Sequence, residues 1–418
     1  MGNARNGASS PPLRNFGGAP ARVVVVGGGV AALEVMIALR ALAQERVAID
    51  LVAPNREFTY EPLSVLEPFE LCETPRFEVA RIAADQSARY HADGAAAADA
   101  DRKRIWTKGR RELRYDTLVV ATGARPREGV GGALHFGGHR DAAGIAALLA
   151  EAERGEVRKI AFAIPAGVVW ALPAYELALN TAAHLAARDV ATSLTLVTPE
   201  DAPLELFGPP VSDMVRGLIE DAGIELLTSS YPTAVQPDGL AVVPAGRVEA
   251  DRVVALPRLE GRFVQGLPHD ERGFIPTGLD GQVKGVADVY AAGDVTTFPV
   301  KQGGIAVEQA ATIAETIAAR AGAPVEPEPF RPVLRGLLLS ASGPRYLSAH
   351  ITRGPAIESE VGVEPLWWPP SKIAGRHLAP FLARWMSVEE TAQREPDIKD
   401  AIPFELDVEG ALKGDGGR

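Results

Sequence analysis

The sequence predicts an α/β fold in which two Rossmann-like dinucleotide-binding domains are followed by a C-terminal capping region. Three observations carry this prediction. A strand, a glycine-rich turn and a helix follow one another over residues 22–44, a second strand–helix–strand pattern occupies residues 157–256, and a proline-rich crossing begins at Ala323. Alternating strands and helices are typical of parallel sheets that carry helices on their faces. The 418 residues also exceed one ordinary core, so more than one domain is expected.

Composition excludes several classes of function. The formal net charge of -11 argues against non-specific nucleic-acid binding, which needs a cationic surface. The single cysteine, Cys72, allows no intramolecular disulfide and no cysteine cluster, so we expect no metal site and a reduced, cytoplasmic compartment. No apolar run reaches the roughly 20 residues of a spanning helix, which leaves peripheral contact with the inner face of a membrane as an alternative. Residues 1–21 lack an apolar segment and are expected to form a flexible arm, not a secretory signal.

The first turn has the pattern of a dinucleotide-binding site. Residues 22–26 are a β-branched run typical of a buried strand, residues 27–32 read Gly-Gly-Gly-Val-Ala-Ala, and a helical pattern covers residues 33–44. In this G-x-G-x-x-A setting Gly27 permits a tight turn, and Gly29 lets backbone amides approach a pyrophosphate at the helix N-terminus. The other residues predicted to line this turn are Val30, Ala31 and Ala32.

The second strand departs from the usual ribose-binding pattern. Residues 47–52 form the strand, and an aspartate or glutamate is expected where it ends. The sequence there reads Ala53-Pro54-Asn55 instead. Either Asn55 or the backbone takes over ribose recognition.

Two later segments extend the pattern. A hydrophobic strand over residues 115–121 closes on Thr122-Gly123, and another over residues 289–292 ends in Gly293-Asp294. A carboxylate suits a polyol because a polyol offers several hydrogen-bond donors. The alternative for Asp294 is an N-cap of the following helix, over residues 306–320.

Together the three motifs resemble the FAD-binding signature of the pyridine nucleotide-disulfide oxidoreductase superfamily, over residues 22 to about 322. The resemblance implies a glutathione-reductase-like arrangement and a non-covalent FAD. Its pyrophosphate would lie at the glycine turn, Thr122 and Gly123 would line the route between the domains, and Asp294 would bind the ribityl chain. It further implies a discontinuous FAD domain at 22–150 and 275–322, an NAD(P)-type domain at 151–274, and a capping region at 323–418 that touches a membrane or forms a dimer.

Two details are similar to the sulfide:quinone reductase and flavocytochrome sulfide dehydrogenase branch. The segment at residues 58–63, which contains Pro62, resembles the aromatic-proline segment beside the flavin there. Lys301-Gln302-Gly303 resembles a Lys-x-Gly segment near the pyrimidine end of the ring. In that place Lys301 would stabilise the anionic reduced flavin, and the alternative is a surface lysine.

The second domain lacks a standard phosphate cradle. Its pattern comprises strands at 158–164, 194–197 and 224–228 and helices at 171–187 and 211–222. The turn at residues 164–176 has one glycine, two prolines and a tryptophan, so NAD(P)H binding is doubtful and stays open.

This turn also resembles the quinone-reductase segment ending in Pro-Ala-Tyr-Glu, in which Trp170 replaces a redox cysteine. Cysteine-based sulfide oxidation is therefore not expected, and Trp170 and Tyr175 would wall the flavin site. Cys72 is interpreted as structural because neighbouring carboxylates raise a thiol pKa.

The C-terminal region combines strand patterns at 333–340 and 345–351 with an unusual segment at 366–386. That segment holds three of the five tryptophans and no acid. One interpretation is a quinone entrance or lipid contact. The favoured one is packing onto the core, because prolines interrupt a long amphipathic helix. Three histidines are interpreted as structural or solvated, namely His135, His139 and His184.

Three functions follow as hypotheses. The first is an FAD-dependent oxidoreductase that passes two electrons between a donor and a quinone-like or other organic acceptor. The second is an NAD(P)H-dependent flavin reductase of the same fold. The third is a flavin-binding regulatory or interaction protein that has lost catalysis.

Overall fold

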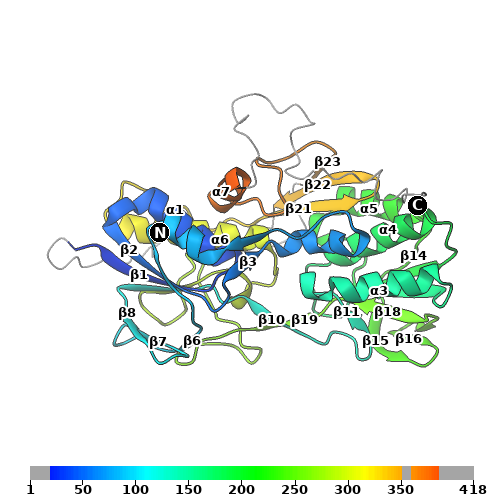
Figure 1. Cartoon of the computed structure of the whole chain (residues 1–418), viewed down its shortest axis with the longest axis horizontal. Coiled ribbons are helices and arrows are strands. Elements are labelled where there is room, and N and C mark those ends of the chain that lie inside the picture. Colours follow the sequence, from blue (N-terminus) through cyan, green and yellow to red (C-terminus); the bar gives the residue numbers. More distant parts are fainter. Residues whose placement is uncertain (1–18, 351–358, 386–418) are drawn as a thin grey trace, which may run out of the picture.

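The computed structural model describes residues 19–350 and 359–385, and Figure 1 shows two α/β halves side by side along its long axis. The first half contains a parallel sheet in the order β20-β9-β1-β2-β5. Its strands are β1 (Ala21–Val26), β2 (Val47–Val52), β5 (Arg89–His91), β9 (Thr117–Val120) and β20 (Val289–Ala291). Valines dominate the buried central strands, as parallel sheets covered on both faces require.

Two long helices pack together on one face of this sheet, as all three views show. They are α1 (Val30–Ala43) and α6 (Gly303–Arg320). Each begins three residues before its predicted start, because the last residues of the preceding turn already have helical geometry. Elements from residues 57–114 flank the sheet: β3 (Glu57–Thr59), a 3₁₀ helix η2 (Glu61–Phe69), β4 (Arg76–Glu78), α2 (Val79–Asp85), β6 (Ala95–Asp99), β7 (Arg104–Thr107) and β8 (Glu112–Arg114).

The second half repeats the architecture with a parallel sheet in the order β11-β18-β12-β13-β14. Its strands are β11 (Leu134–His135), β12 (Lys159–Ala163), β13 (Ser193–Val197), β14 (Glu225–Leu227) and β18 (Arg252–Ala255). Its helices are α3 (Ala142–Glu153), α4 (Leu172–Ala186) and α5 (Pro209–Asp221), and a small antiparallel sheet joins β15 (Tyr231–Gln236), β16 (Gly239–Val243) and β17 (Gly246–Val248). The predicted α/β fold with two Rossmann-like halves is confirmed, and the domain limits stay predictions.

A two-stranded antiparallel ribbon crosses between the halves. It consists of β10 (Ala124–Arg127) and β19 (Arg258–Gly261). The hydroxyl of Thr122 donates to the carbonyl of Arg262 at 2.6 Å beside this ribbon. The chain therefore leaves the first half at the carboxyl edge of its sheet, where ligands of open α/β sheets bind.

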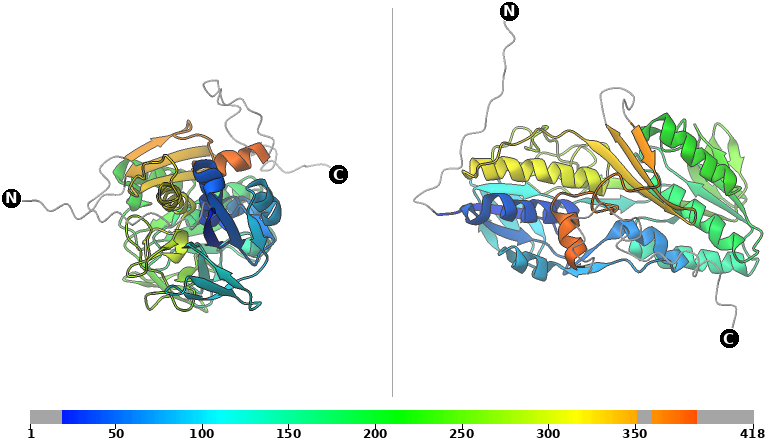
Figure 2. Two further views of the ribbon diagram at one scale, coloured as in Figure 1. Left: turned by 90° about the vertical axis from the view of Figure 1, so that its left-hand side faces the viewer. Right: turned by 90° about the horizontal axis from the view of Figure 1, so that it is seen from above.

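The C-terminal region forms a third layer over both halves. It comprises the antiparallel strands β21 (Val333–Ser340), β22 (Gly343–His350) and β23 (Ser359–Gly362), and the short helix α7 (Leu378–Trp385). Figure 2 shows β21 and β22 lying across the joint between the halves. The predicted strand at 345–351 begins earlier, at Gly343, and its last residue lies outside the described residues, as does Met386. Among the described residues, no helix is both long and apolar enough to cross a membrane.

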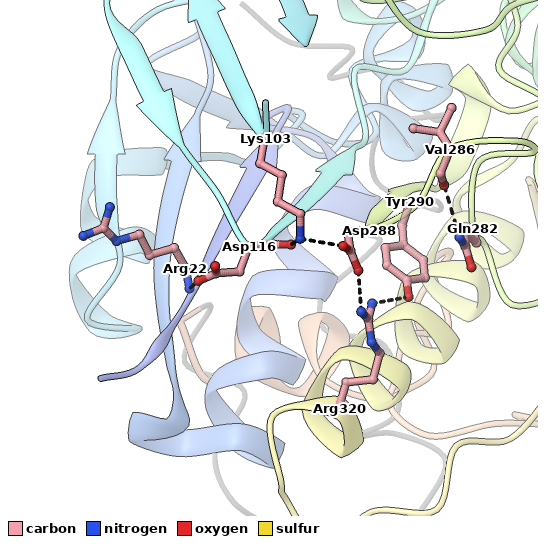
Figure 3. Close-up of polar contacts among 8 residues, drawn as sticks. All are labelled: Arg22, Lys103, Asp116, Gln282, Val286, Asp288, Tyr290 and Arg320. Atoms are coloured by element: carbon pink, nitrogen blue, oxygen red, sulfur yellow. Dashed lines mark hydrogen bonds and ion pairs between the residues drawn. The ribbon is translucent and has the colours of Figure 1, made fainter. Parts of the chain in front are cut away.

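A charged cluster closes the edge of the first sheet at which its strands begin (Figure 3). Asp288 accepts hydrogen bonds from Lys103, at 2.5 Å, and from Arg320 at the end of α6. Arg320 also donates to the hydroxyl of Tyr290 at 2.9 Å. Asp116 accepts from the backbone of Arg22 at 2.7 Å, which ties β1 to the same edge. This cluster fixes α6 to the sheet from the end remote from the glycine turn.

Candidate functional site

The glycine turn after β1 has the backbone geometry that close approach to a phosphate requires. Gly27 has a φ of 131° and donates to the carbonyl of Val52 at 2.9 Å. A Cβ at this position would overlap the carbonyl oxygen of Ala121, so only glycine fits. Gly29 is the N-cap of α1, and a Cβ built there meets no atom within 4 Å. The turn therefore leaves open space over the backbone amides at the start of α1.

The Gly293–Asp294 motif lies directly against this turn. Gly293 has a φ of 77°, and a Cβ built on it would lie 3.2 Å from the Cβ of Ala31 and 3.4 Å from that of Ala306. Its amide donates to the side chain of Gln309 at 2.7 Å. Gly293 and Ala31, which are 262 positions apart in the chain, are thus in contact.

Asp294 lines a pocket and does not cap α6. The N-cap of α6 is Gln302, whose side chain accepts from Gly304 at 2.5 Å, so the N-cap alternative for Asp294 is wrong. Burial raises the pKa of Asp294, and the charge of Lys301 opposes that shift. Within residues 19–350 and 359–385, no donor forms a hydrogen bond with its carboxylate. A half-buried acid of this kind fits a polyol such as the ribityl chain.

A pocket of about 370 Å³ lies where the two halves and the C-terminal layer meet. Four predicted flavin-site residues line it together, namely Pro62, Asp294, Lys301 and Gln302. Trp170 lines it as well, whereas Tyr175 does not belong to the lining residues. Much of the remaining wall is apolar, from Val168, Val169, Leu259, Phe298 and Leu337.

Lys301 is half-buried in this wall. Its ammonium group donates to the carbonyl of Thr296 and lies 4.1 Å from the ring centroid of Phe274. Burial lowers the pKa of Lys301 to about 8; the Asp294 carboxylate opposes this shift, and the Arg272 guanidinium adds to it. A cation at this place can stabilise negative charge in the pocket and titrates close to neutrality.

The other residues predicted to contact the cofactor differ in whether they already form hydrogen bonds within the protein. The amide nitrogen of Gln302 is buried and has no hydrogen-bond partner among the described residues. Gly123 has a φ of 69° and open space at its Cβ position. Asn55 is exposed, and its carbonyl accepts from Tyr90 at 2.9 Å. The open backbone at the turn and the unpaired Asp294 together fit an FAD molecule.

The corresponding turn of the second half is filled by side chains. Trp170 packs against Phe207 with ring centroids 5.8 Å apart. Tyr175 is buried in α4 and donates to Glu200, directly after β13, at 2.8 Å. Thr198 donates to the same carboxylate oxygen at 2.8 Å. Burial raises the pKa of Glu200 to about 7. The acid that follows the second strand is thus engaged inside the protein.

The segment at 366–385 packs onto the core, as the favoured interpretation expected. Trp367 donates to the carbonyl of Ser371 at 2.9 Å and contacts the ring of Tyr346. Trp385 lies 4.5 Å from the guanidinium of Arg81. Of these tryptophans only Trp368 is substantially exposed, at 50%.

Two buried glutamates that bind this segment escaped the sequence interpretation. Glu176, in α4, accepts two hydrogen bonds from Lys372, and both residues line the pocket. Glu34, in α1, accepts from the backbone of His377 and Leu378. In the sequence, the only sign of these two buried glutamates was that each is a charged residue on an otherwise apolar helix face. Their partners lie 196 and more than 340 residues away, so spacing could not reveal them.

The three histidines considered in the sequence analysis all form hydrogen bonds within the protein, and two of them pair with glutamates. His139 binds Glu61 at 2.8 Å, and His184 binds Glu153 at 2.7 Å. His135 accepts backbone hydrogen bonds from residues 129 and 130. Among the described residues, no group of three or more His, Cys, Asp or Glu side chains could bind a metal ion.

Comparison with known proteins agrees with this geometry. The family model for pyridine nucleotide-disulphide oxidoreductases matches residues 21–316. The probable ferredoxin reductase CtmF of Castellaniella defragrans is 28% identical over 313 residues, which are 67% of this chain and 68% of that protein. The sulfide:quinone oxidoreductase of Aquifex aeolicus has the same fold, with a TM-score of 0.73 and 19% identity over 82% of this chain and 87% of that one.

A ferredoxin reductase of the CYP199A2 system from Rhodopseudomonas palustris has a TM-score of 0.61 and 17% identity, over 82% of this chain and 91% of that one. These structural likenesses establish the fold, and the family model extends over more than half of the chain. The predicted superfamily is confirmed. The chain therefore belongs to the pyridine nucleotide-disulphide oxidoreductase family, and it is an oxidoreductase that uses FAD.

Proposed function

We propose that this protein passes two electrons through a non-covalent FAD to a small, quinone-like organic acceptor. The observation that carries the proposal is the pocket of about 370 Å³, which combines Asp294 and Lys301 with apolar side chains such as Val168 and Trp170. Pockets of this size and lining suit planar, mostly apolar small molecules. A cytoplasmic location belongs to the same proposal, and peripheral membrane contact and a homodimer stay predictions.

The residues of the chain have separate tasks in this scheme. Bound FAD supplies the group that stores the electrons. Asp294 and the turn at Gly27 would fix the cofactor, and the ammonium group of Lys301 would favour its reduced, anionic form. Apolar walls around Trp170 exclude water and provide a surface for an aromatic acceptor.

The second half supports an electron donor other than a nicotinamide. Its turn contains Pro165 and Pro173, which donate no amide hydrogen, and only one glycine, Gly167. An acid after the second strand of a Rossmann domain ordinarily binds the adenosine ribose. Glu200 has that place, yet its carboxylate is already bound by Tyr175 and Thr198.

A second candidate is an NAD(P)H-dependent reductase of the same fold. The place of Glu200 after β13 favours it, and so does the similarity to a probable ferredoxin reductase at 28% identity. This candidate requires Tyr175 to release Glu200 when a nucleotide binds.

Anaerobic reduction of the purified, FAD-loaded protein distinguishes these functions. NADH, NADPH, sulfide and a soluble hydroquinone are added in turn, and loss of the oxidised flavin absorbance is followed. We expect bleaching by the hydroquinone and its reversal by the matching quinone. Fast bleaching by either nicotinamide would select the second candidate. Inertness to every donor would instead favour a flavin-binding regulatory or interaction protein.

A further inference from the structure

A buried ion pair forms part of the pocket wall and has no role in the scheme above. Lys372, from the C-terminal segment, donates to the two carboxylate oxygens of Glu176 at 2.6 and 2.7 Å. The backbone amide of Leu339 donates to the same carboxylate at 2.8 Å. The side chains of Lys372 and Glu176 are only 6% and 1% exposed, and both line the pocket.

Burying this ion pair costs free energy, so attachment of the C-terminal segment alone does not explain it. Removing two charges from water costs several kcal/mol per ion, and well-packed apolar side chains of similar size often stabilise a protein as well or better. The neighbouring contact shows that alternative, because Ile373 packs tightly against Gly303. A pair that faces a ligand pocket therefore suggests a chemical role.

The geometry leaves the ammonium group one free donor. An ammonium group has three N–H bonds, and two of them are used by Glu176. Within residues 19–350 and 359–385, Lys372 has no other hydrogen-bond acceptor. The third N–H is therefore available to a molecule in the pocket.

The other charged groups that face the pocket are less suited to deliver a proton to an acceptor. Glu61 is bound to His139, and the guanidinium of Arg272 does not release a proton in the physiological range. Asp294 and Lys301 come from the strand–helix connection that carries the predicted cofactor contacts. Of the charged residues that line the pocket, only Lys372 comes from the C-terminal layer.

We propose that Lys372 is the proton donor to the quinone-like acceptor and that Glu176 is the positioning residue that orients it. This inference rests on the proposed function. Reduction of a quinone to a hydroquinone takes up two electrons and two protons. One proton passes from the Nζ of Lys372 to an acceptor oxygen, and the other accompanies the two electrons. The neutral amine of Lys372 then regains a proton from water at the pocket mouth.

The test compares two electron acceptors after the bound flavin has been reduced by light under anaerobic conditions. Menadione needs protons for its reduction, and ferricyanide takes electrons alone. We expect Lys372→Met to slow reoxidation by menadione by about 10²-fold or more while reoxidation by ferricyanide stays within about twofold of the wild type. Added ethylamine should restore part of the menadione rate. Lys108→Met, at an exposed lysine outside the pocket lining, is the matched control and should change neither rate.

A second measurement separates chemistry from folding. Lys372→Met leaves the buried carboxylate of Glu176 unpaired and should lower the thermal unfolding midpoint, whereas the double variant Glu176→Gln with Lys372→Met should recover most of that loss. The double variant should still reduce menadione slowly, because the proton donor is absent.

Three outcomes are decisive against the proposals. Equal slowing of both acceptors in the folded double variant would show a structural role and overturn the inference. A wild-type menadione rate in Lys372→Met would overturn it as well, with the proposed function intact. A wild-type protein that reduces ferricyanide but no quinone would instead overturn the proposed function.

Discussion

The carboxylate of Glu34, in the second turn of α1, accepts hydrogen bonds from the backbone amides of His377 and Leu378 at 3.1 and 2.6 Å. It thereby caps the N-terminus of α7, and the helix that begins at the phosphate-binding turn also anchors the C-terminal layer. Anions are favourable at this end of a helix. Burial nevertheless dominates and raises the pKa of Glu34 to about 7 from an ordinary value of 4.5.

This shift predicts a pH dependence of stability. Because the pKa of Glu34 is higher in the folded state, its contribution is fully present below about pH 4.5 and is lost as the pH rises through about 7. The difference amounts to roughly 3 kcal/mol. Glu34→Gln cannot ionise, so its unfolding midpoint should fall less than that of the wild type between pH 5 and pH 8. Parallel curves for the two proteins would contradict this assignment.

Asp288 should contribute a pH dependence of stability that is opposite in sign to that of Glu34. Burial acts to raise its pKa, but hydrogen bonds from Lys103 and Arg320 outweigh that effect and lower it. Its contribution is therefore present above the unfolded pKa and lost as the pH falls through the folded one. Asp288→Asn should lower the unfolding free energy at pH 7 by about 1–3 kcal/mol, and the loss should shrink in acid. Denaturant unfolding at pH 7 and pH 3 checks this, and a loss that grows in acid would contradict it.

Lys301 should tune the potential of the bound flavin. Replacing it with methionine removes a cation from the pocket, so the midpoint potential should fall by tens of millivolts, since about 30 mV corresponds to 1.4 kcal/mol for two electrons. Lys301→Arg should keep most of the potential. In the wild type the effect should fade above about pH 8, where the lysine loses its proton. Spectroelectrochemical titration measures these values, and an unchanged potential in Lys301→Met would place the cofactor ring elsewhere.

Cys72 should be an unreactive thiol. Burial raises its pKa to about 11, with added effects from the charges of Glu67 and Glu73. About one thiol in a thousand is then ionised at pH 8, so alkylation by iodoacetamide should be about 100-fold slower than in the urea-unfolded chain. The rate should rise tenfold per pH unit up to pH 10. Rapid labelling of the folded protein at pH 8 would refute the assignment.

The elements that sequence predicted best are those fixed by local patterns. The valine-rich strand before Gly27 and the small residues around Gly293 leave few other conformations, so their turn geometry followed from residue type. The contacts of Glu34, Glu176 and Lys372 could not be predicted, because each depends on where a distant chain segment crosses the core. Tyr175 could not be placed from the sequence either. It lies in the segment that resembles the quinone reductases, but its hydroxyl donates to Glu200 and its side chain does not line the pocket.

Equilibrium binding of FAD to the cofactor-free protein tests the central claim most directly. The wild type should bind one FAD per chain, and Gly27→Ala should weaken binding by at least about tenfold, because its methyl group would overlap the carbonyl of Ala121. Asp294→Ala should also weaken binding, while Gly155→Ala, at an open position where φ is positive as well (73°), should not. Unchanged FAD affinity in both Gly27→Ala and Asp294→Ala would contradict the account.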